Sequence, residues 1–236
     1  MNADGSNHEP DNEPTDATDP SDSTDAIDST DSTDATDSSD VTDADIEHAA
    51  EAIRAGQAVV YPTETVYGLG ADATDPAAVE RVYELKDRPR DKPLSVAFGS
   101  VEAALSLVPA SDRAARFARA FLPGPVTVVV DRGDALPGEL TDGEPRVGIR
   151  VPDHGTARSL ADAAGPITAT SANRSGAGSV RRVEGLDSRV RDGAAAVLDG
   201  GETPGGESTV VDPDRGVIHR AGPLADEIRE WLASEP

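Results

Sequence analysis

The chain has 236 residues and a formal charge of -24, from 45 Asp and Glu against 21 Lys and Arg, and it contains no cysteine. The lack of cysteine excludes a disulfide framework and a thiolate metal site, and the negative charge disfavours autonomous binding to nucleic acid backbones. Lysine is rare beside arginine, and aromatic residues make up 3% of the chain. This composition indicates a halophilic protein, which works in concentrated salt where charge repulsion is screened.

The N-terminal residues 1–45 hold 15 acidic residues and no Lys or Arg. Asp falls at every third position from Asp16 to Asp43, separated mostly by Ser, Thr and Ala. A segment with so little to bury cannot offset the entropy cost of ordering. The sequence therefore predicts a disordered acidic low-complexity tail at 1–45, which is a solvated spacer or a binding or phosphorylation tail. One folded domain is predicted at 46–236.

The folded part alternates between helices and strands. The first helix is predicted in DADIEHAAEAIRAG, with Asp43 or Asp45 as its N-cap and Gly56 at its end. A second helix is predicted in TDPAAVERVYELK, where Asp75 and Pro76 form a typical start. Further helices are expected at 101–107, 112–121, 156–164 and 224–232.

Short apolar strands lie between these helices, in AVVYP, LSVAF, VTVVV, RVGIRV, PITAT, AAVLD, STVVD and GVIHR. The alternation predicts an α/β domain in which helices cover a sheet, and the last three strands, close together in the chain, indicate an antiparallel part. No apolar run reaches the ~20 residues of a membrane helix, and the N-terminus lacks a basic-then-apolar signal region. We therefore expect a cytoplasmic protein with no membrane partner and no second domain.

The run ELKDRPRDKPL holds both lysines of the chain, Lys86 and Lys92, with Arg88 and Arg90 between them. Lys86 continues the apolar stripe of its helix, four residues after Val82. A lysine near a helix C-terminus can simply complement the helix dipole. However, a cation on the core-facing stripe, followed by two arginines, also favours a pocket for a polyanion.

Two polar segments follow strands and are candidates for ligand contacts. PITATSANRSGAGS brings Ser171, Asn173 and Ser179 into a Gly-rich loop, which can offer amides and hydroxyls to phosphate oxygens or be a plain polar turn. YPTETVYGLGADA places Thr63 just past a strand end, where ligands of α/β sheets tend to bind. The sequence contains no GxxxxGK loop, and its four histidines lack metal-ligand spacing, so no metal site made of protein side chains is expected.

Taken in order, YPTETVYGLG, ELKDRPRDKPL, LPGPVTVVV, VGIRVPDH, TATSANRSG, ESTVVD and HRAGP resemble the YrdC-like threonylcarbamoyl-AMP synthases. The resemblance covers nearly the whole folded part. It implies an open, twisted mixed sheet with flanking helices and a deep cationic cleft. It also implies that 46–236 is a YrdC-like catalytic domain of the single-domain form.

The implied activity is that of an L-threonylcarbamoyladenylate synthase, a nucleotidyltransferase that joins L-threonine, bicarbonate and ATP to give threonylcarbamoyl-AMP and pyrophosphate. The product would go to a tRNA threonylcarbamoyl-transferase complex, which modifies tRNA to carry threonylcarbamoyladenosine. Attack of a carbamate on the α-phosphate brings two anions together. The reaction therefore needs fixed cations and hydrogen-bond donors, with Mg²⁺ expected beside ATP.

The resemblance also implies roles for individual residues. The K-x-R and S-x-N signatures of the family imply that the catalytic residues are Lys86, Arg88, Ser171 and Asn173. Lys86 would bind the phosphates, and Arg88 would orient the carbamate and a phosphate. ATP contacts are implied for Lys86, Arg90, Thr127, Ser171, Ser179 and Arg220. Threonine contacts are implied for Thr63, Arg150 and Ser208.

Two features depart from the family pattern. Ala97 stands where some longer members carry a His in the strand after the basic run, and the acidic tail has no counterpart. Two other functions stay open. The first is an RNA-binding module that uses the cationic cleft, for which weak binding to double-stranded RNA is possible. The second is a same-fold enzyme that makes another carbamoyl or acyl adenylate. The acidity weighs against the first, and both signatures together with Arg150 favour threonine over the second.

Overall fold

The computed structural model describes residues 41–234, so most of the predicted acidic tail lies outside the described residues. The strands are β1 (Ala58–Tyr61), β2 (Gly68–Gly70), β3 (Ser95–Ala97), β4 (Val126–Asp131), β5 (Arg146–Arg150), β6 (Ile167–Ser171), β7 (Ala194–Val197), β8 (Thr209–Asp212) and β9 (Val217–Arg220). The α-helices are α1 (Asp43–Arg54), α2 (Pro76–Lys86), α3 (Val101–Leu107), α4 (Asp112–Phe121), α5 (Gly155–Ala164), α6 (Ser188–Gly193) and α7 (Ala225–Ser234). Two short 3-10 helices are η1 (Gly138–Leu140) and η2 (Val183–Gly185).

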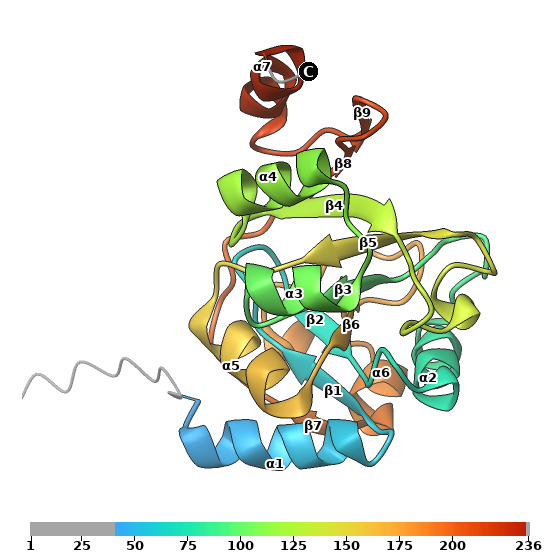
Figure 1. Cartoon of the computed structure of the whole chain (residues 1–236). Coiled ribbons are helices and arrows are strands. Elements are labelled where there is room, and N and C mark those ends of the chain that lie inside the picture. Colours follow the sequence, from blue (N-terminus) through green and yellow to red (C-terminus); the bar gives the residue numbers. More distant parts are fainter. Residues whose placement is uncertain (1–40, 235–236) are drawn as a thin grey trace, which may run out of the picture. The chain divides into compact units, whose positions relative to one another are not determined.

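The strands of the described part form one mixed sheet in the order β7-β1-β2-β6-β3-β5-β4-β8-β9 (Figure 1). The pairs β1–β7, β3–β5 and β4–β8 are parallel, and the other neighbouring pairs are antiparallel. In each parallel pair, helices and at least one other strand lie between the two partners along the chain, consistent with the long connections that parallel strands need. The predicted α/β sheet with flanking helices is therefore confirmed.

Strand side chains alternate between two apolar clusters because successive residues of a strand point to opposite faces. Val60 and Val96 join a cluster with residues of α2, α3, α4 and α6, whereas Val59 and Tyr61 join a cluster with α1 and α5. Among the described residues, this second cluster takes no member from β4, β5 or β8. On this face of the sheet, α1 and α5 therefore pack against the other strands, and no apolar cluster covers β4, β5 and β8.

The predicted strands and helices differ from the structure in three places. The sequence pattern misses β2 and the short helix α6. It also groups β7 with β8 and β9, but β7 pairs in parallel with β1 at the opposite edge of the sheet. The predicted antiparallel pairing of the last strands is confirmed for β8 and β9.

The first helix begins with a capping box that lies inside the range assigned to the tail. Its N-cap is Thr42, not Asp43 or Asp45. Thr42 Oγ1 accepts a hydrogen bond from the Asp45 amide at 3.3 Å, and the Thr42 amide donates to Asp45 Oδ2 at 3.0 Å. This reciprocal pattern satisfies two amides at the helix start, so residues 42–45 belong to the folded domain.

Replacing Thr42 by alanine is expected to lower the free energy of unfolding by about 1 kcal/mol, because an N-cap hydroxyl satisfies an otherwise unpaired amide. Thr42→Ser keeps the hydroxyl and is expected to retain most of this stability. Urea unfolding followed by circular dichroism measures both variants. A Thr42→Ala protein as stable as the unchanged chain would contradict a role for this cap.

Among residues 41–234, no helix is both long enough and apolar enough to cross a membrane. The longest described helix, α1, has 12 residues and carries several charged side chains.

Candidate active site

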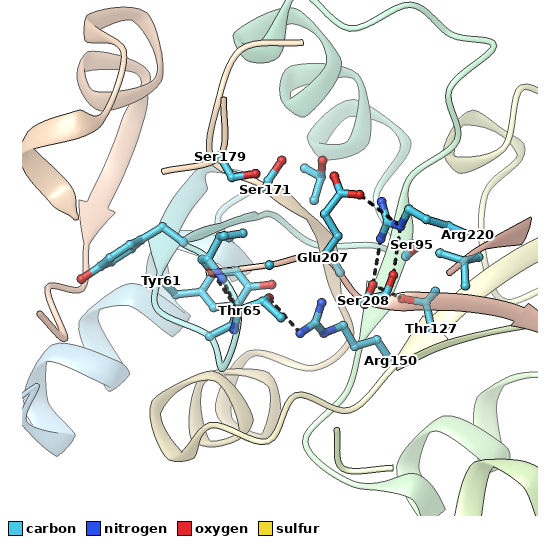
Figure 2. Close-up of a pocket in the computed structure, with 18 of the residues that line it drawn as sticks. Tyr61, Thr65, Ser95, Thr127, Arg150, Ser171, Ser179, Glu207, Ser208 and Arg220 are labelled. Atoms are coloured by element: carbon cyan, nitrogen blue, oxygen red, sulfur yellow. Dashed lines mark hydrogen bonds and ion pairs between the residues drawn. The ribbon is translucent and has the colours of Figure 1, made fainter. Parts of the chain in front are cut away.

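A cavity of about 310 Å³ opens on the same sheet face as α1 and α5, next to the strands β4, β5 and β8 that no apolar cluster covers there. Its walls come from the turn between β1 and β2, from β3, β4 and β5, and from the segments around β6, β8 and β9. Three arginines and several hydroxyl side chains line it, and Figure 2 shows Arg150 and Arg220 among them. Most of the predicted site residues lie here, namely Thr63, Arg88, Thr127, Arg150, Ser171, Ser179, Ser208 and Arg220.

One side of the cavity is a chain of hydrogen bonds between predicted residues (Figure 2). Thr127 Oγ1 and Ser208 Oγ lie 3.1 Å apart. Arg220 donates from Nη2 to Ser208 Oγ and from Nε to the Ser208 carbonyl, both at 2.9 Å. A Cβ at Gly148 would lie within 2.7 Å of Ser95 Oγ and Thr127 Cγ2, so only glycine leaves these two side chains room in the cavity floor.

A second side of the cavity joins the β1–β2 turn to the end of β5. Thr63 Oγ1 donates to the Val66 carbonyl at 2.6 Å and so closes the turn. Arg150 Nη2 donates to Glu64 Oε1 at 2.5 Å and to Thr65 Oγ1 at 3.4 Å. The two side chains of this ion pair are each 13% exposed. The turn thus fixes one edge of the Arg150 guanidinium beside the cavity.

Lys86 lies outside the cavity lining, at the end of α2, and its side chain is almost fully buried. Its Nζ donates to the carbonyl oxygens of Ser171 and Asn173, and its own carbonyl accepts from the Ser175 amide at 2.9 Å. Burial, with a smaller effect of the Arg88 charge, lowers the pKa of Lys86 to about 7. The predicted core-facing position is confirmed, and Lys86 holds the loop that carries the S-x-N signature.

Of the other three signature residues, Arg88 and Ser171 line the cavity, whereas Asn173 does not. Arg88 lines the cavity and donates to the Lys92 and Pro93 carbonyls at 2.8 and 3.0 Å, while burial lowers its pKa. Ser171 also lines the cavity. Asn173 turns inward to its own loop, where Nδ2 donates to the Arg174 and Ala177 carbonyls.

Arg90 is the third predicted residue outside the cavity lining, beside Lys86 and Asn173. Its guanidinium forms an ion pair with Glu80 and lies 4.4 Å from the ring centre of Tyr83. The guanidinium of Arg90 therefore lies against residues of α2. Its contact with ATP stays a prediction.

Several lining residues were not among those predicted. Glu207 is the one acidic residue among the described residues of the lining, and Ser95, Thr65 and Tyr61 are further polar ones. Burial raises the pKa of Tyr61 to about 12, so its hydroxyl stays neutral. Two of these residues could have been found from their neighbours in the sequence. Glu207 directly precedes the predicted site residue Ser208 in ESTVVD, and Ser95 starts the strand after the basic run.

Ala97, named above as a departure from the family pattern, is fully buried in β3 and pairs with Arg150 of the neighbouring strand β5. Its methyl group belongs to the apolar cluster beneath α1 and α5. This position therefore supplies no polar contact to the cavity.

The mixed sheet and its cavity of arginines and hydroxyl groups define an α/β protein with a pocket suited to an anionic ligand. The family model Sua5/YciO/YrdC, described as telomere recombination, matches residues 51–222. The chain therefore belongs to the Sua5/YciO/YrdC family, as the sequence motifs predict.

Relatives from two domains of life support this membership. The threonylcarbamoyl-AMP synthase of Pyrococcus abyssi is 40% identical over 172 residues, which cover 71% of this chain and 50% of the relative. A putative threonylcarbamoyl-AMP synthase of Mycobacterium tuberculosis is 39% identical over 189 residues, covering 77% of this chain and 86% of the relative. The chain thus spans about half the length of some curated relatives that it matches and most of the length of others.

Solved structures agree with the fold. Sua5 of P. abyssi complexed with L-threonine superposes with a TM-score of 0.72 at 39% identity, over 80% of this chain and 57% of that structure. YciO of Escherichia coli superposes with a TM-score of 0.68 at 25% identity, over 75% of this chain and 88% of that structure.

Proposed function

We propose that this protein is an L-threonylcarbamoyladenylate synthase, which joins L-threonine, bicarbonate and ATP to give threonylcarbamoyl-AMP and pyrophosphate. The observation that carries the proposal is the cavity. It gathers three arginines and a set of hydroxyl side chains at positions that the family motifs single out. The names of the relatives and the threonine bound to P. abyssi Sua5 support the same activity.

The threonine end of the site would be the β1–β2 turn with Arg150. The guanidinium uses Nη2 for Glu64, which leaves other N–H groups for a ligand carboxylate. Thr63 and Ser208 would contact the remaining polar groups of threonine. The ion pair with Glu64 holds the guanidinium in place before the ligand arrives, so little ordering entropy remains to be lost on binding.

The phosphate end would use Arg88, Arg220 and the hydroxyls of Thr127, Ser171 and Ser179. An oxygen of the threonine carbamate forms a bond to the α-phosphorus of ATP, and the bond from that phosphorus to the bridging oxygen of pyrophosphate breaks. Fixed cations stabilise the charge that develops on the phosphates. Mg²⁺, when bound with ATP, would supply positive charge that offsets the charge of the leaving pyrophosphate.

Pyrophosphate release is expected only when ATP, L-threonine and bicarbonate are all present, because the carbamate is the nucleophile. A coupled phosphate assay after pyrophosphatase treatment measures it, with each substrate omitted in turn. L-Alanine in place of L-threonine serves as the matched control substrate. Pyrophosphate formed at an equal rate without threonine would contradict the proposal.

We further propose that the product passes to a tRNA threonylcarbamoyl-transferase complex in the cytoplasm. An activated carbamoyl-adenylate reacts readily with water, so a nearby acceptor avoids its loss. The acidic composition supports work in concentrated salt, where a phosphate backbone binds weakly. Direct contact with double-stranded RNA would therefore be weak, and a filter-binding titration at the working salt measures it.

A further inference from the structure

Glu207 places a carboxylate in a cavity whose other charged lining residues are arginines. It is the one acidic residue among the described residues of the lining, which also contains Arg88, Arg150 and Arg220. In Figure 2 its side chain extends toward Arg220 from the segment that leads into β8. A triphosphate brought to these arginines would also meet this carboxylate, and like charges at short range repel each other.

The Glu207 carboxylate forms an ion pair with Arg220, but the contact is long and exposed. Its Oε2 lies 3.8 Å from Arg220 Nε, whose hydrogen bond goes to the Ser208 carbonyl instead. The Glu207 side chain is 64% exposed, in contrast to Glu64, which is 13% exposed and tightly paired with Arg150. Glu64 is held by a short ion pair, whereas the long ion pair of Glu207 leaves its carboxylate freer to meet a ligand in the cavity.

The backbone that carries Glu207 is held in place although its side chain is loose. The Gly205 amide donates to the Thr65 carbonyl at 2.6 Å, which ties this segment to the threonine-side turn. Gly205 and Gly206 both have positive φ, a conformation that glycine adopts without strain. The chain therefore presents residue 207 at a defined point of the cavity edge.

A divalent cation bound between a carboxylate and a triphosphate removes the repulsion between these two anionic groups. Mg²⁺ in nucleotide sites is typically held by one or two carboxylates together with phosphate oxygens and waters. Among the described residues, no group of three or more His, Cys, Asp or Glu could hold a metal ion alone. A single carboxylate beside phosphate-binding arginines matches this shared kind of coordination.

We propose that Glu207 is the protein ligand, directly or through one water, of the Mg²⁺ that accompanies the triphosphate. The proposal rests on the proposed function, since it requires that this cavity binds ATP. It assigns a metal-binding role to a residue that neither signature contains.

The test compares ATP affinity with Mg²⁺ and with EDTA, by isothermal titration calorimetry, for the unchanged protein and Glu207→Gln. We expect Glu207→Gln to weaken binding of Mg²⁺–ATP at least fivefold. Binding of metal-free ATP is expected to stay equal or become tighter, because a repelling charge is gone. Glu207→Asp keeps the carboxylate and should keep the preference for Mg²⁺.

Glu202→Gln is the matched control, because Glu202 lies on the same segment but pairs with Arg181 and Arg182 outside the cavity lining. It should leave both affinities within twofold. Tighter binding of both forms of ATP to Glu207→Gln would overturn the proposal and make Glu207 a mere competitor for Arg220. Weaker threonine binding with unchanged ATP affinities would overturn it too. A failure of the unchanged protein to bind ATP in either buffer would refute the proposed function itself.

Discussion

Replacing Lys86 by methionine is expected to lower the rate of pyrophosphate release at least tenfold, a loss of about 1.4 kcal/mol or more in transition-state stabilisation. Methionine is similar in length but removes the donor to the Ser171 and Asn173 carbonyls. Buried carbonyls without a partner disfavour the present loop conformation. Ser171 then moves from the place where it lines the cavity.

Lys92→Met is the matched control, since Lys92 is the other lysine of the chain and its side chain is exposed. Its backbone carbonyl, which accepts from Arg88, is unaffected by the substitution. We expect a rate within twofold of the unchanged protein. A Lys86→Met enzyme as fast as Lys92→Met would contradict any role for Lys86 in the site.

The pH dependence of stability gives Lys86 a second readout. Burial lowers its pKa to about 7 in the folded protein, whereas the unfolded chain keeps the ordinary value of 10.5. Between these values the unfolded state binds a proton that the folded state lacks, so this group makes stability rise with pH, by about 1.4 kcal/mol per unit at most. Urea unfolding from pH 7 to 9 should show this rise, and Lys86→Met should remove it.

The sequence predicts most of the sheet because its strands are short apolar runs with clear ends. β2 escapes detection because Gly68–Gly70 has no branched or alternating pattern, and it forms by pairing with β1 and β6 on either side. The position of β7 beside β1 depends on a pairing between segments more than 130 residues apart. Periodicity along the chain carries no information about such a partner.

The family resemblance identified the site best where a residue lies in a strand or beside one, since the strand fixes the direction of its side chain. Thr127 lies in β4, Arg150 ends β5 and Ser208 directly precedes β8, and all three line the cavity. Lys86 lies at a helix end and contacts carbonyl groups that only the folded chain brings near, whereas Asn173 turns to carbonyls of its own loop. A motif therefore identifies such residues without revealing what they touch.

Arg150→Lys is expected to raise the KM for L-threonine about tenfold or more, while the KM for ATP stays within twofold. Lysine keeps a positive charge opposite Glu64, so the buried carboxylate is not left unpaired, which would cost about 3–5 kcal/mol. It loses the planar fork that can hold Glu64 and a ligand carboxylate at the same time. An ammonium shared with Glu64 offers a weaker and less directed contact to threonine.

Arg158→Lys is the matched control for this substitution, because Arg158 pairs with Asp153 at 3.2 Å and does not belong to the cavity lining. It should leave both KM values unchanged within twofold. Initial rates at varied threonine and saturating ATP, and the reverse, separate the two constants. A rise in the KM for ATP with an unchanged KM for threonine would move Arg150 to the phosphate end of the site. The threonine end would then have to be assigned elsewhere, because no other described arginine of the lining is fixed by the β1–β2 turn.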